Sequence, residues 1–505
     1  MRSWIRAALA LALLAPLGAL ADNELSAWAQ LDARAGVVTD VTLDHGHEHG
    51  GLAGGSRLRL HADWETHPSL TLTAELDLDG FDLFAATPEV EEIGWSDPYG
   101  GFGGHALRAD PRFVYLTHTS MIGQLRVGQM GSDWGLGLVA NSGSRRPHWG
   151  VSRHGDLVER VVFATRPAVW FTGATWAEKT FLAVGGDLVY RDENASLLEG
   201  DLALQGVASL LYRERAGEKE LGVYVAYRDQ TDRPDEVGLE SKLQVLATDL
   251  YGAWAWHFGE DLQVSVKGEL AYLHGFTSRL RTDVAPEGVD IRALGWAVLP
   301  ELEYAPAGLS FGFWAGYASG DADAEDDRLT RMRFDPEFRP SVVLFEEVLA
   351  LTSARWAVRA RDPAHVNVPP AGSQYLATTG SVSGASFFGP QLRWESHFVE
   401  GLELKAGLLF ARATAPLIDP YGTFAAGGEP VNLFETPATE QNLGVELDIA
   451  ARWTHHLMKH LELAIEMEYG HLFPGAAFEL AEGRMAPVAS TWIGAELAWH
   501  FGGEE

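Results

Sequence analysis

The chain has 505 residues, of which 46% are hydrophobic and 10% aromatic, with no cysteine and a formal net charge of −32. The lack of cysteine excludes structural disulfides, thiol catalysis and cysteine-ligated zinc or iron–sulfur sites. The negative charge repels nucleic-acid phosphates, so neither DNA nor RNA is an expected partner.

The first 21 residues predict a cleaved export signal. Arg2 and Arg6 give a basic start, an apolar run covers 7–14, and Ala19-Leu20-Ala21 forms a small-x-small cleavage site. That run is too short to be a membrane anchor, and no run of roughly 18 apolar residues follows it. We therefore expect residues 22–505 to form one exported domain that does not cross a membrane with helices.

After this signal, apolar and polar residues alternate along many segments of the chain. Because successive side chains of a strand point to opposite faces, such segments have one apolar and one polar side. A soluble β-sandwich would give the same pattern. Strands of about 10 to 15 residues, aromatic residues at strand ends and alternating short and long turns favour a transmembrane barrel.

In chain order, the pattern predicts an all-β fold: a single transmembrane antiparallel up-and-down β-barrel of about 18 strands, with 16 as the alternative. The first strand is weak, and we include it because a closed barrel of this kind has an even strand count. The predicted ranges are 27–43, 56–65, 69–79, 112–119, 122–130, 158–176, 180–190, 200–214, 220–229, 243–258, 261–274, 290–304, 309–318, 386–398, 402–414, 441–455, 461–472 and 489–501.

Three short turns share a pattern that orients the expected barrel. Strands that end at Phe258, Phe398 and Leu457 each turn directly into a new alternating segment, and the chain closes with the same unit at Trp499-His500-Phe501. In outer-membrane barrels the short turns and both termini are periplasmic. We expect that orientation here and interpret Trp499 and Phe501 as a membrane-insertion signal.

A glycine-rich stretch carries a family resemblance. It reads Gly123-Gln124-Leu125-Arg126-Val127-Gly128-Gln129-Met130-Gly131-Ser132-Asp133-Trp134-Gly135-Leu136-Gly137 and is followed by Asp156 and Arg160-Val161-Val162-Phe163. Over about 110–165 the chain resembles an uncharacterised outer-membrane β-barrel family of myxobacteria and relatives. The resemblance implies a porin-like barrel without an established substrate. The motif residues are Gly123, Arg126, Gly128, Trp134, Gly135, Gly137, Asp156 and Arg160.

Charged residues on the polar side of the strands indicate a wet interior. In a dry core each would cost several kcal/mol unless paired, whereas a barrel of about 18 strands is wide enough for an aqueous channel. A plugged lumen, with its charges paired across strands, is the alternative to the conducting pore that we favour. The expected lumen-lining residues are Arg59, Glu75, Asp77, Arg126, Lys267, Glu269, Glu403, Lys405, Glu446, Asp448, Arg452, Glu462, Glu466 and Glu496.

A long insertion at 319–385 interrupts the strands. Its stretch from Ser341 to about Trp356 could form a short amphipathic helix, bounded by prolines on both sides. The insertion is expected either to fold into the barrel as a constriction loop or to cover the rim as an extracellular flap. Its acidic start resembles a solvated charge run more than a calcium loop, since it lacks the glycine and distal glutamate of an EF-hand.

Two further groups of residues are weaker candidates. His45, His47 and His49 could share one face of an extended chain and bind zinc or copper, or they could belong to a glycine-flanked loop without fixed geometry. His118 with Ser120, and His154 with Ser152 and Asp156, are residue types found in catalytic sets, but they are merely close in sequence here. No nucleophile-elbow motif is present. We therefore do not expect an enzyme.

The pattern as a whole favours a porin-like outer-membrane channel for passive diffusion of small hydrophilic solutes. Acidic residues outnumber basic ones among the lumen candidates, which predicts a mild preference for cations. The alternative is a non-conducting surface barrel whose long extracellular loops bind a partner. Expected partners are outer-membrane lipid and lipopolysaccharide, the outer-membrane insertion machinery and small solutes; no cofactor is expected.

Overall fold

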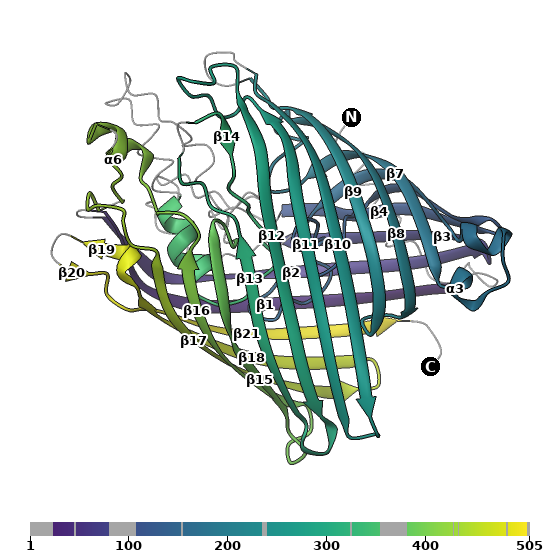
Figure 1. The fold of residues 1–505 in the computed structure, drawn as a ribbon. Helices are drawn as coiled ribbons and strands as arrows, with labels where there is room; N and C mark the ends of the chain where they lie inside the picture. The colour runs from purple at the N-terminus through teal and green to yellow at the C-terminus, as the bar shows by residue number, and fades with distance from the viewer. Residues whose placement is uncertain are drawn as a thin grey trace.

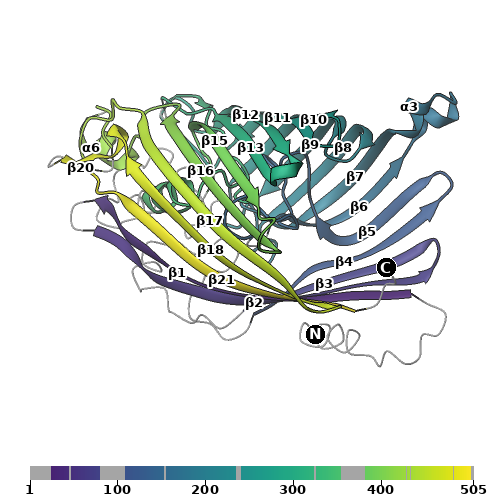
Figure 2. The ribbon, with the colours of Figure 1, turned by 90° about the horizontal axis from the view of Figure 1, so that it is seen from below.

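Long antiparallel strands follow one another around a closed barrel, which Figures 1 and 2 show from two directions. The computed structural model describes residues 24–44, 47–79, 108–152, 155–234, 240–323, 326–353, 381–427, 429–432, 434–480 and 483–501. The barrel strands are β1 (Glu24–Asp44), β2 (His47–His67), β3 (Leu70–Asp79), β4 (Arg108–Ser120), β5 (Gly123–Gly131), β6 (Leu157–Thr165), β7 (Thr180–Arg191), β8 (Leu202–Arg215), β9 (Lys219–Thr231), β10 (Lys242–Phe258), β11 (Leu262–Thr277), β12 (Val289–Tyr304), β13 (Leu309–Ala318), β15 (Ala385–Glu395), β16 (Leu402–Ala413), β17 (Asn442–Met458), β18 (Leu461–Pro474) and β21 (Val488–Phe501).

Short elements lie in the connections between these strands. Within the described residues, no helix is both long enough and apolar enough to cross a bilayer. The short elements are η1 (Pro167–Trp170), α3 (Thr175–Glu178), η2 (Ala305–Ala307), β14 (Arg328–Leu329), η3 (Leu344–Leu349), α6 (Pro420–Ala425), η5 (Ala476–Phe478), β19 (Glu479–Leu480) and β20 (Gly483–Arg484).

The first and last strands close the barrel. Strand β1 pairs antiparallel with β2 on one side and with β21 on the other, where Ala27 lies opposite Phe501 and Val38 opposite Ser490. The closed barrel has 18 strands, so each strand has two neighbours and the sheet has no free edge. The prediction of an all-β antiparallel barrel with 18 rather than 16 strands is confirmed, and the weak first strand belongs to it.

Side-chain alternation separates an apolar outer face from a charged inner face. On β11, Leu270 and Tyr272 are about 40% exposed, whereas Ala271 between them is 0% exposed and Glu269 before them is 3% exposed. Directly paired residues of neighbouring strands share a face, so Trp296 of β12, opposite Leu270, also points outward. The outer face therefore presents the apolar surface that a transmembrane strand needs against lipid.

One predicted strand is too long. The alternation suggested a strand over 158–176, but β6 ends at Thr165 and the chain continues through η1 and α3. Pro167 has no backbone N–H to donate to a neighbouring strand, so the ladder stops just before it. The exposed aromatic residues Trp170, Phe171 and Trp176 then stand at the short-turn end of the barrel.

The two ends of the barrel differ in the length of their connections. At one end, tight turns join β4 to β5, β8 to β9, β10 to β11 and β17 to β18, and the ladder there also contains Glu24 and Phe501. At the other end, long loops follow β5, β13 and β16. The loops after β5 and after β13 fold back inside the ring of strands, where Glu269 and Glu446 of the wall accept their backbone N–H groups.

Candidate functional site in the barrel lumen

The loop after β5, residues 132–156 and called here the β5 loop, is held by one carboxylate of the wall. Glu269 of β11 accepts hydrogen bonds from the backbone N–H groups of Leu136, Gly137 and Leu138, the last two at 3.1 Å. Gly135 and Gly137 have φ angles of 55° and 85°, which L side chains rarely adopt, and a Cβ at Gly135 would collide with the Glu269 carboxylate. The glycines of the sequence motif thus let the backbone wrap around Glu269.

Other motif residues attach the β5 loop and β6 to the same wall. The Trp134 indole donates to Asp249 of β10 at 3.0 Å and stacks on Tyr224 of β9 with ring centroids 5.4 Å apart. Arg160 forms two hydrogen bonds of 2.7 Å with Asp187 of β7. The second half of the motif, from Trp134 to Arg160, therefore contributes contacts that hold the β5 loop and the start of β6 in place.

The first half of the motif lies in β5 itself. Gly123 follows the tight turn after β4, and Gly128 has a φ of 130° where a Cβ would collide with the carbonyl oxygen of Val114. Arg126 lies opposite Thr117, and its guanidinium carbon is 5.7 Å from the centre of the Tyr115 ring. The strand register gives Arg126 and Arg160 the same inward face.

The insertion after β13, residues 319–384 and called here the long loop, is held in a similar way by β17. Glu446 accepts hydrogen bonds from the N–H groups of Val342, Val343 and Leu344 at 2.9, 2.5 and 2.8 Å. The helical segment expected near 341–356 begins at Leu344 and continues to residue 353, beyond which the description stops until residue 381. These contacts lie inside the barrel, as a constriction loop requires.

The two loops also contact each other. The N–H group of Asp335 donates to the carbonyl of Leu138 at 2.8 Å. Leu138, Trp149, Phe334 and Phe345 are buried together with small wall residues that include Ala271, Ala293 and Ala297. The wall is built from small residues where loop side chains are large, so the loops pack tightly against it.

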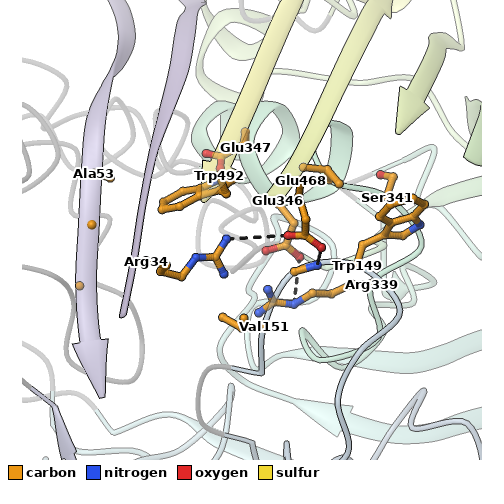
Figure 3. Close-up of a pocket in the computed structure, with 14 residues that line it drawn as sticks. Arg34, Ala53, Trp149, Val151, Arg339, Ser341, Glu346, Glu347, Glu468 and Trp492 are labelled. Atoms are coloured by element: carbon orange, nitrogen blue, oxygen red, sulfur yellow. Dashed lines mark hydrogen bonds and ion pairs between the residues drawn. The ribbon is translucent and has the colours of Figure 1, made fainter. Parts of the chain in front are cut away.

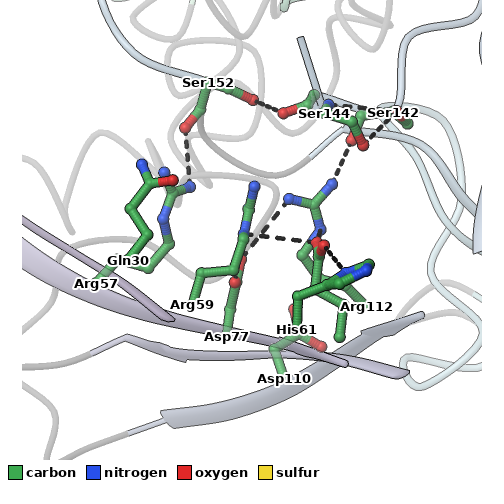
Figure 4. A network of polar contacts seen from close by, with 12 residues as sticks. Gln30, Arg57, Arg59, His61, Asp77, Asp110, Arg112, Ser142, Ser144 and Ser152 are labelled. Atoms are coloured by element: carbon green, nitrogen blue, oxygen red, sulfur yellow. Dashed lines mark hydrogen bonds and ion pairs between the residues drawn. The ribbon is translucent and has the colours of Figure 1, made fainter. Parts of the chain in front are cut away.

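A charged network lies on the adjacent wall (Figure 4). Arg59 of β2 donates two hydrogen bonds of 2.7 and 2.8 Å to Asp77 of β3, and Arg112 of β4 lies 3.4 Å from Glu75. All four side chains are buried. The predicted lumen residues Arg59, Glu75 and Asp77 thus belong to one ion-pair network, which Arg112 completes.

This network reaches the β5 loop through its arginines. Arg112 donates to the carbonyl of Ser142 at 2.6 Å, and Arg57 donates to the carbonyl of Ser152 at 2.9 Å (Figure 4). Guanidinium groups satisfy loop carbonyls on this part of the wall, whereas Glu269 of β11 and Glu446 of β17 satisfy loop N–H groups elsewhere on it. Backbone groups that leave water inside the barrel are paired in this way.

Lys405 and Glu403 of β16 form an ion pair of 3.3 Å, and Lys405 also donates to the carbonyl of His148 in the β5 loop at 3.3 Å. Burial and the nearby charge of Lys405 lower the pKa of His148 to about 3. The His148 ring is therefore neutral at physiological pH, and it contributes packing against Trp314 rather than charge.

Several predicted residues cluster on β17, β18 and β21. Arg452 lies 3.1 Å from Glu496 and 3.7 Å from Glu466, and Arg146 of the β5 loop pairs with Glu466 as well. Glu462 lies four residues before Glu466 on the same face of β18, and it is half-buried beside His456. These acidic groups outnumber the two arginines that neutralise them.

The remaining predicted residues differ in their exposure. Lys267 lies on the inward face of β11 next to Glu269 and is partly exposed. Asp448 is completely buried one alternation step from Glu446, opposite Gly470 of β18. Here Val342 and Val343 of the long loop press on the wall, and a Cβ at Gly470 would lie 2.7 Å from Val343 and 2.8 Å from Val342.

A small cavity of about 70 Å³ remains between both loops and the wall (Figure 3). Arg34 of β1 lies 4.0 Å from Glu468 of β18, and Glu468 accepts a hydrogen bond from the Gly150 N–H at 2.8 Å. Arg339 of the long loop lies 3.6 Å from Glu346. The cavity is thus edged by charges from the wall and from both loops.

A larger cavity of about 230 Å³ is lined by other parts of the β5 loop and the long loop. One part of its lining is apolar, with Leu138, Leu243 and Met332, and the other part contains buried arginines and carboxylates. Sequence reasoning did not find this chamber, because loops without periodicity supply much of its lining. The charged lining residues are Asp156, Asp192, Glu193, Arg228, Arg279, Arg331, Arg333 and Asp335.

The histidine and serine candidates are not assembled into a site among the described side chains. His45 and the side chains of His47 and His49 lie outside the described part of the structure, as does His154. The Ser120 hydroxyl donates to the carbonyl of Gly123 at 2.9 Å, while His118 lies 3.2 Å from the carbonyl of Ser69.

Trp499 and Phe501, predicted as an insertion signal, lie at the end of β21. Their rings stack at 4.7 Å, and both are more than 40% exposed on the outer face. Phe258 and Phe398 are likewise exposed at the short-turn end. Exposed aromatic residues therefore gather at this end of the barrel, as they do at the membrane–water interface of transmembrane barrels.

No family model matches the chain, and no curated protein matches it in sequence. Solved structures match it along almost the full length. Acinetobacter baumannii OccAB2 has a TM-score of 0.53 at 11% identity, covering 94% of this chain and 98% of that chain. The outer membrane protein OprD from Pseudomonas aeruginosa has a TM-score of 0.50 at 9% identity, covering 94% of each chain.

A third structure, Acinetobacter baumannii OccAB1, has a TM-score of 0.50 at 8% identity and covers 96% of this chain and 99% of that chain. At such low identity the likeness concerns the path of the backbone and not the side chains that line it. The chain therefore has the porin-like barrel fold that OccAB2, OprD and OccAB1 share.

Proposed function

We propose that the chain is an outer-membrane channel for passive diffusion of small hydrophilic solutes, with both termini in the periplasm. The observation that carries the proposal is the pair of inward loops, each held by one wall carboxylate, Glu269 or Glu446, that accepts several backbone N–H groups. Such fixed loops narrow a wide barrel to a polar passage whose walls are charged.

The apolar outer face and the aromatic residues at the short-turn end support a position in a bilayer. On this proposal the partners are outer-membrane lipid and lipopolysaccharide, and Trp499 and Phe501 are read by the insertion machinery. The resemblance of residues 110–165 to an uncharacterised family of myxobacterial barrels stays a prediction, as does the lumen-lining role of the charged wall residues.

The proposed channel has a mild preference for cations. The group around Arg452 supports this, because Glu462, Glu466 and Glu496 exceed the positive charges near them. Many other wall carboxylates, such as Glu269 and Asp77, are already paired with loop N–H groups or arginines. A modest rather than strong selectivity is therefore expected.

Planar-bilayer recordings test the proposal with the full chain refolded into detergent. We expect discrete conductance steps and, under a potassium chloride gradient, a reversal potential that indicates potassium permeating about two- to fivefold better than chloride. Glu496→Gln should reduce this ratio, while Asp261→Asn, in a short turn outside the lumen, should leave it unchanged. The absence of conductance at any voltage would refute the channel, and an anion preference would refute the charge argument.

A second candidate function is a non-conducting barrel whose long loops bind a partner. The apolar cluster between the β5 loop, the long loop and the wall favours it, because Phe334, Val343 and Phe345 are nearly inaccessible to water. The same recordings separate the two candidates: a refolded barrel that inserts into the bilayer and stays electrically silent supports this one.

A further inference from the structure

Three separate segments bring carboxylates together beside the larger cavity. Asp156 comes from the end of the β5 loop, and Asp192 and Glu193 come from the connection after β7. Carboxylate oxygens of these three residues all lie within 4.8 Å of one another. Asp335 of the long loop lines the same cavity, and it is the carboxylate that most strongly influences the titration of Asp156.

Two of the four carboxylates have a positive neighbour. Arg228 of β9 donates to both oxygens of Asp192 at 2.5 and 3.3 Å. Burial opposes the ionisation of Asp192, but the Arg228 charge outweighs it and lowers the pKa of Asp192. Arg333 is the principal positive charge acting on Glu193, and it donates to the neighbouring Asn194 side chain at 2.8 Å.

The other two carboxylates lack such compensation. Asp156 and Asp335 are 7% and 3% exposed, and in each one carboxylate oxygen has no hydrogen-bond partner among the described residues. The second oxygen of Asp156 accepts from the N–H of Asn141 at 3.2 Å, and that of Asp335 from the N–H of Glu337 at 2.8 Å. Leaving a buried charged oxygen unpaired costs on the order of 1–3 kcal/mol or more, so these two oxygens indicate a missing positive partner.

The other arginines around the cavity are engaged elsewhere. Arg279 forms two hydrogen bonds with Asp232, at 2.7 and 2.6 Å. Arg331 donates to Ser383 at 2.9 Å, and Asp321 is the carboxylate whose charge favours the protonated form of Arg331. Neither arginine is therefore the partner that Asp156 and Asp335 lack.

We propose that Asp156, Asp192, Glu193 and Asp335 bind one divalent cation, Ca²⁺, at the junction of the β5 loop, the connection after β7 and the long loop. The carboxylate oxygens of Asp156, Asp192 and Glu193 lie within 4.8 Å of one another, so small side-chain adjustments bring them to the 2.3–2.6 Å from a shared ion that Ca²⁺ prefers, and Asp335 lines the same cavity. The donors are all oxygens, which favours a hard cation over zinc or copper.

The charge balance supports a divalent ion. Arg228 and Arg333 offset two of the four carboxylates, and one Ca²⁺ offsets the remaining two. Because the ligands come from three segments that are distant in sequence, the ion would fasten both inward loops to the same point of the wall. The site therefore supplies a link between the loops that does not depend on whether the barrel conducts.

Calorimetric titration of the full chain, refolded from denaturant into detergent without lipopolysaccharide and stripped with chelator, tests the proposal. Calcium chloride should bind with a stoichiometry of about one per chain, and magnesium chloride should bind more weakly because Mg²⁺ tolerates irregular geometry less well. Asp156→Asn should weaken Ca²⁺ binding by about tenfold or more. The matched control is Asp232→Asn, which removes the same charge beside Arg279 but leaves the four carboxylates in place.

Asp335→Asn provides a second variant if Asp156→Asn does not refold, as judged by circular dichroism. It should also weaken Ca²⁺ binding by about tenfold or more. No Ca²⁺ uptake by the unmodified chain would overturn the proposal, as would unchanged affinity in a folded Asp156→Asn or Asp335→Asn protein. Equal losses in these variants and in Asp232→Asn would also overturn it, since general lumen charge would then explain the binding.

Discussion

Replacing Glu446 by glutamine should release the long loop from the barrel wall. The carboxylate accepts three backbone N–H groups, and each hydrogen bond to a charged acceptor contributes about 1.5–3 kcal/mol. The amide in Glu446→Gln keeps one acceptor oxygen and turns an NH₂ group toward a backbone donor. We estimate a cost of about 2–4 kcal/mol, which shifts the docking equilibrium by about 30- to 1,000-fold.

Hydrogen–deuterium exchange of the full chain in detergent measures this release directly. The amides of Val342, Val343 and Leu344 should lose protection in Glu446→Gln, and single-channel conductance should rise as the loop leaves the passage. Glu403→Gln is the matched control, because Glu403 lies on the same inner wall but pairs with Lys405 rather than with loop N–H groups. If Glu446→Gln exchanges no faster than the control at these amides, Glu446 does not hold the loop.

Two further predictions concern the packing of the loops. Gly470→Val should displace the long loop, because even a Cβ would stand 2.7 Å from Val343; conductance should increase while the barrel stays folded by circular dichroism, and an unchanged conductance would contradict the assigned contact. Burial and neighbouring carboxylates raise the pKa of Asp156 and of Asp335 well above 3.8. These groups bind protons more tightly when folded, so stability is highest at acid pH and falls as the pH rises through the raised values. In chelator, the thermal midpoint followed by tryptophan fluorescence should therefore drop as the pH rises above the ordinary range of an aspartate. Millimolar Ca²⁺ should reduce the drop, and a midpoint independent of pH would count against this account.

The strands could be predicted because an apolar outer face and a charged inner face give nearly every one of them a period of two. The same alternation identifies Glu269 and Glu446 as inward-facing carboxylates. The weak first strand is included because a closed barrel of this kind has an even number of strands. The sequence pattern predicts too long a β6, because the apolar residues continue past Pro167, whereas the N–H that proline lacks ends the ladder before it. Glu468 could also have been found, since it lies on the same face as Glu462 and Glu466.

The chamber residues could not be predicted, for a different physical reason. Asp192, Arg333 and Asp335 belong to connections without periodicity, and their proximity depends on how two loops fold across the lumen. The motif glycines carry a family resemblance in the sequence, but the reason for them is visible only in the structure. Gly135 is required because Glu269 occupies the space that a Cβ at this position would need. A one-dimensional pattern does not contain such a pairing between residues of different segments.

The seam between β1 and β21 has a consequence for how the barrel forms. Residues paired there, such as Ala27 and Phe501, stand almost at opposite ends of the chain, so their contact has the greatest loop-closure entropy of any pair in the ladder. Every other strand pairs with a sequence neighbour and can zip up locally, whereas this contact must wait for the last strand. Until then β1 and β18 each expose an unpaired edge. Closure of this seam is therefore expected to be the slow step of refolding, and aggregation through the open edges should compete with it more strongly as the protein concentration rises.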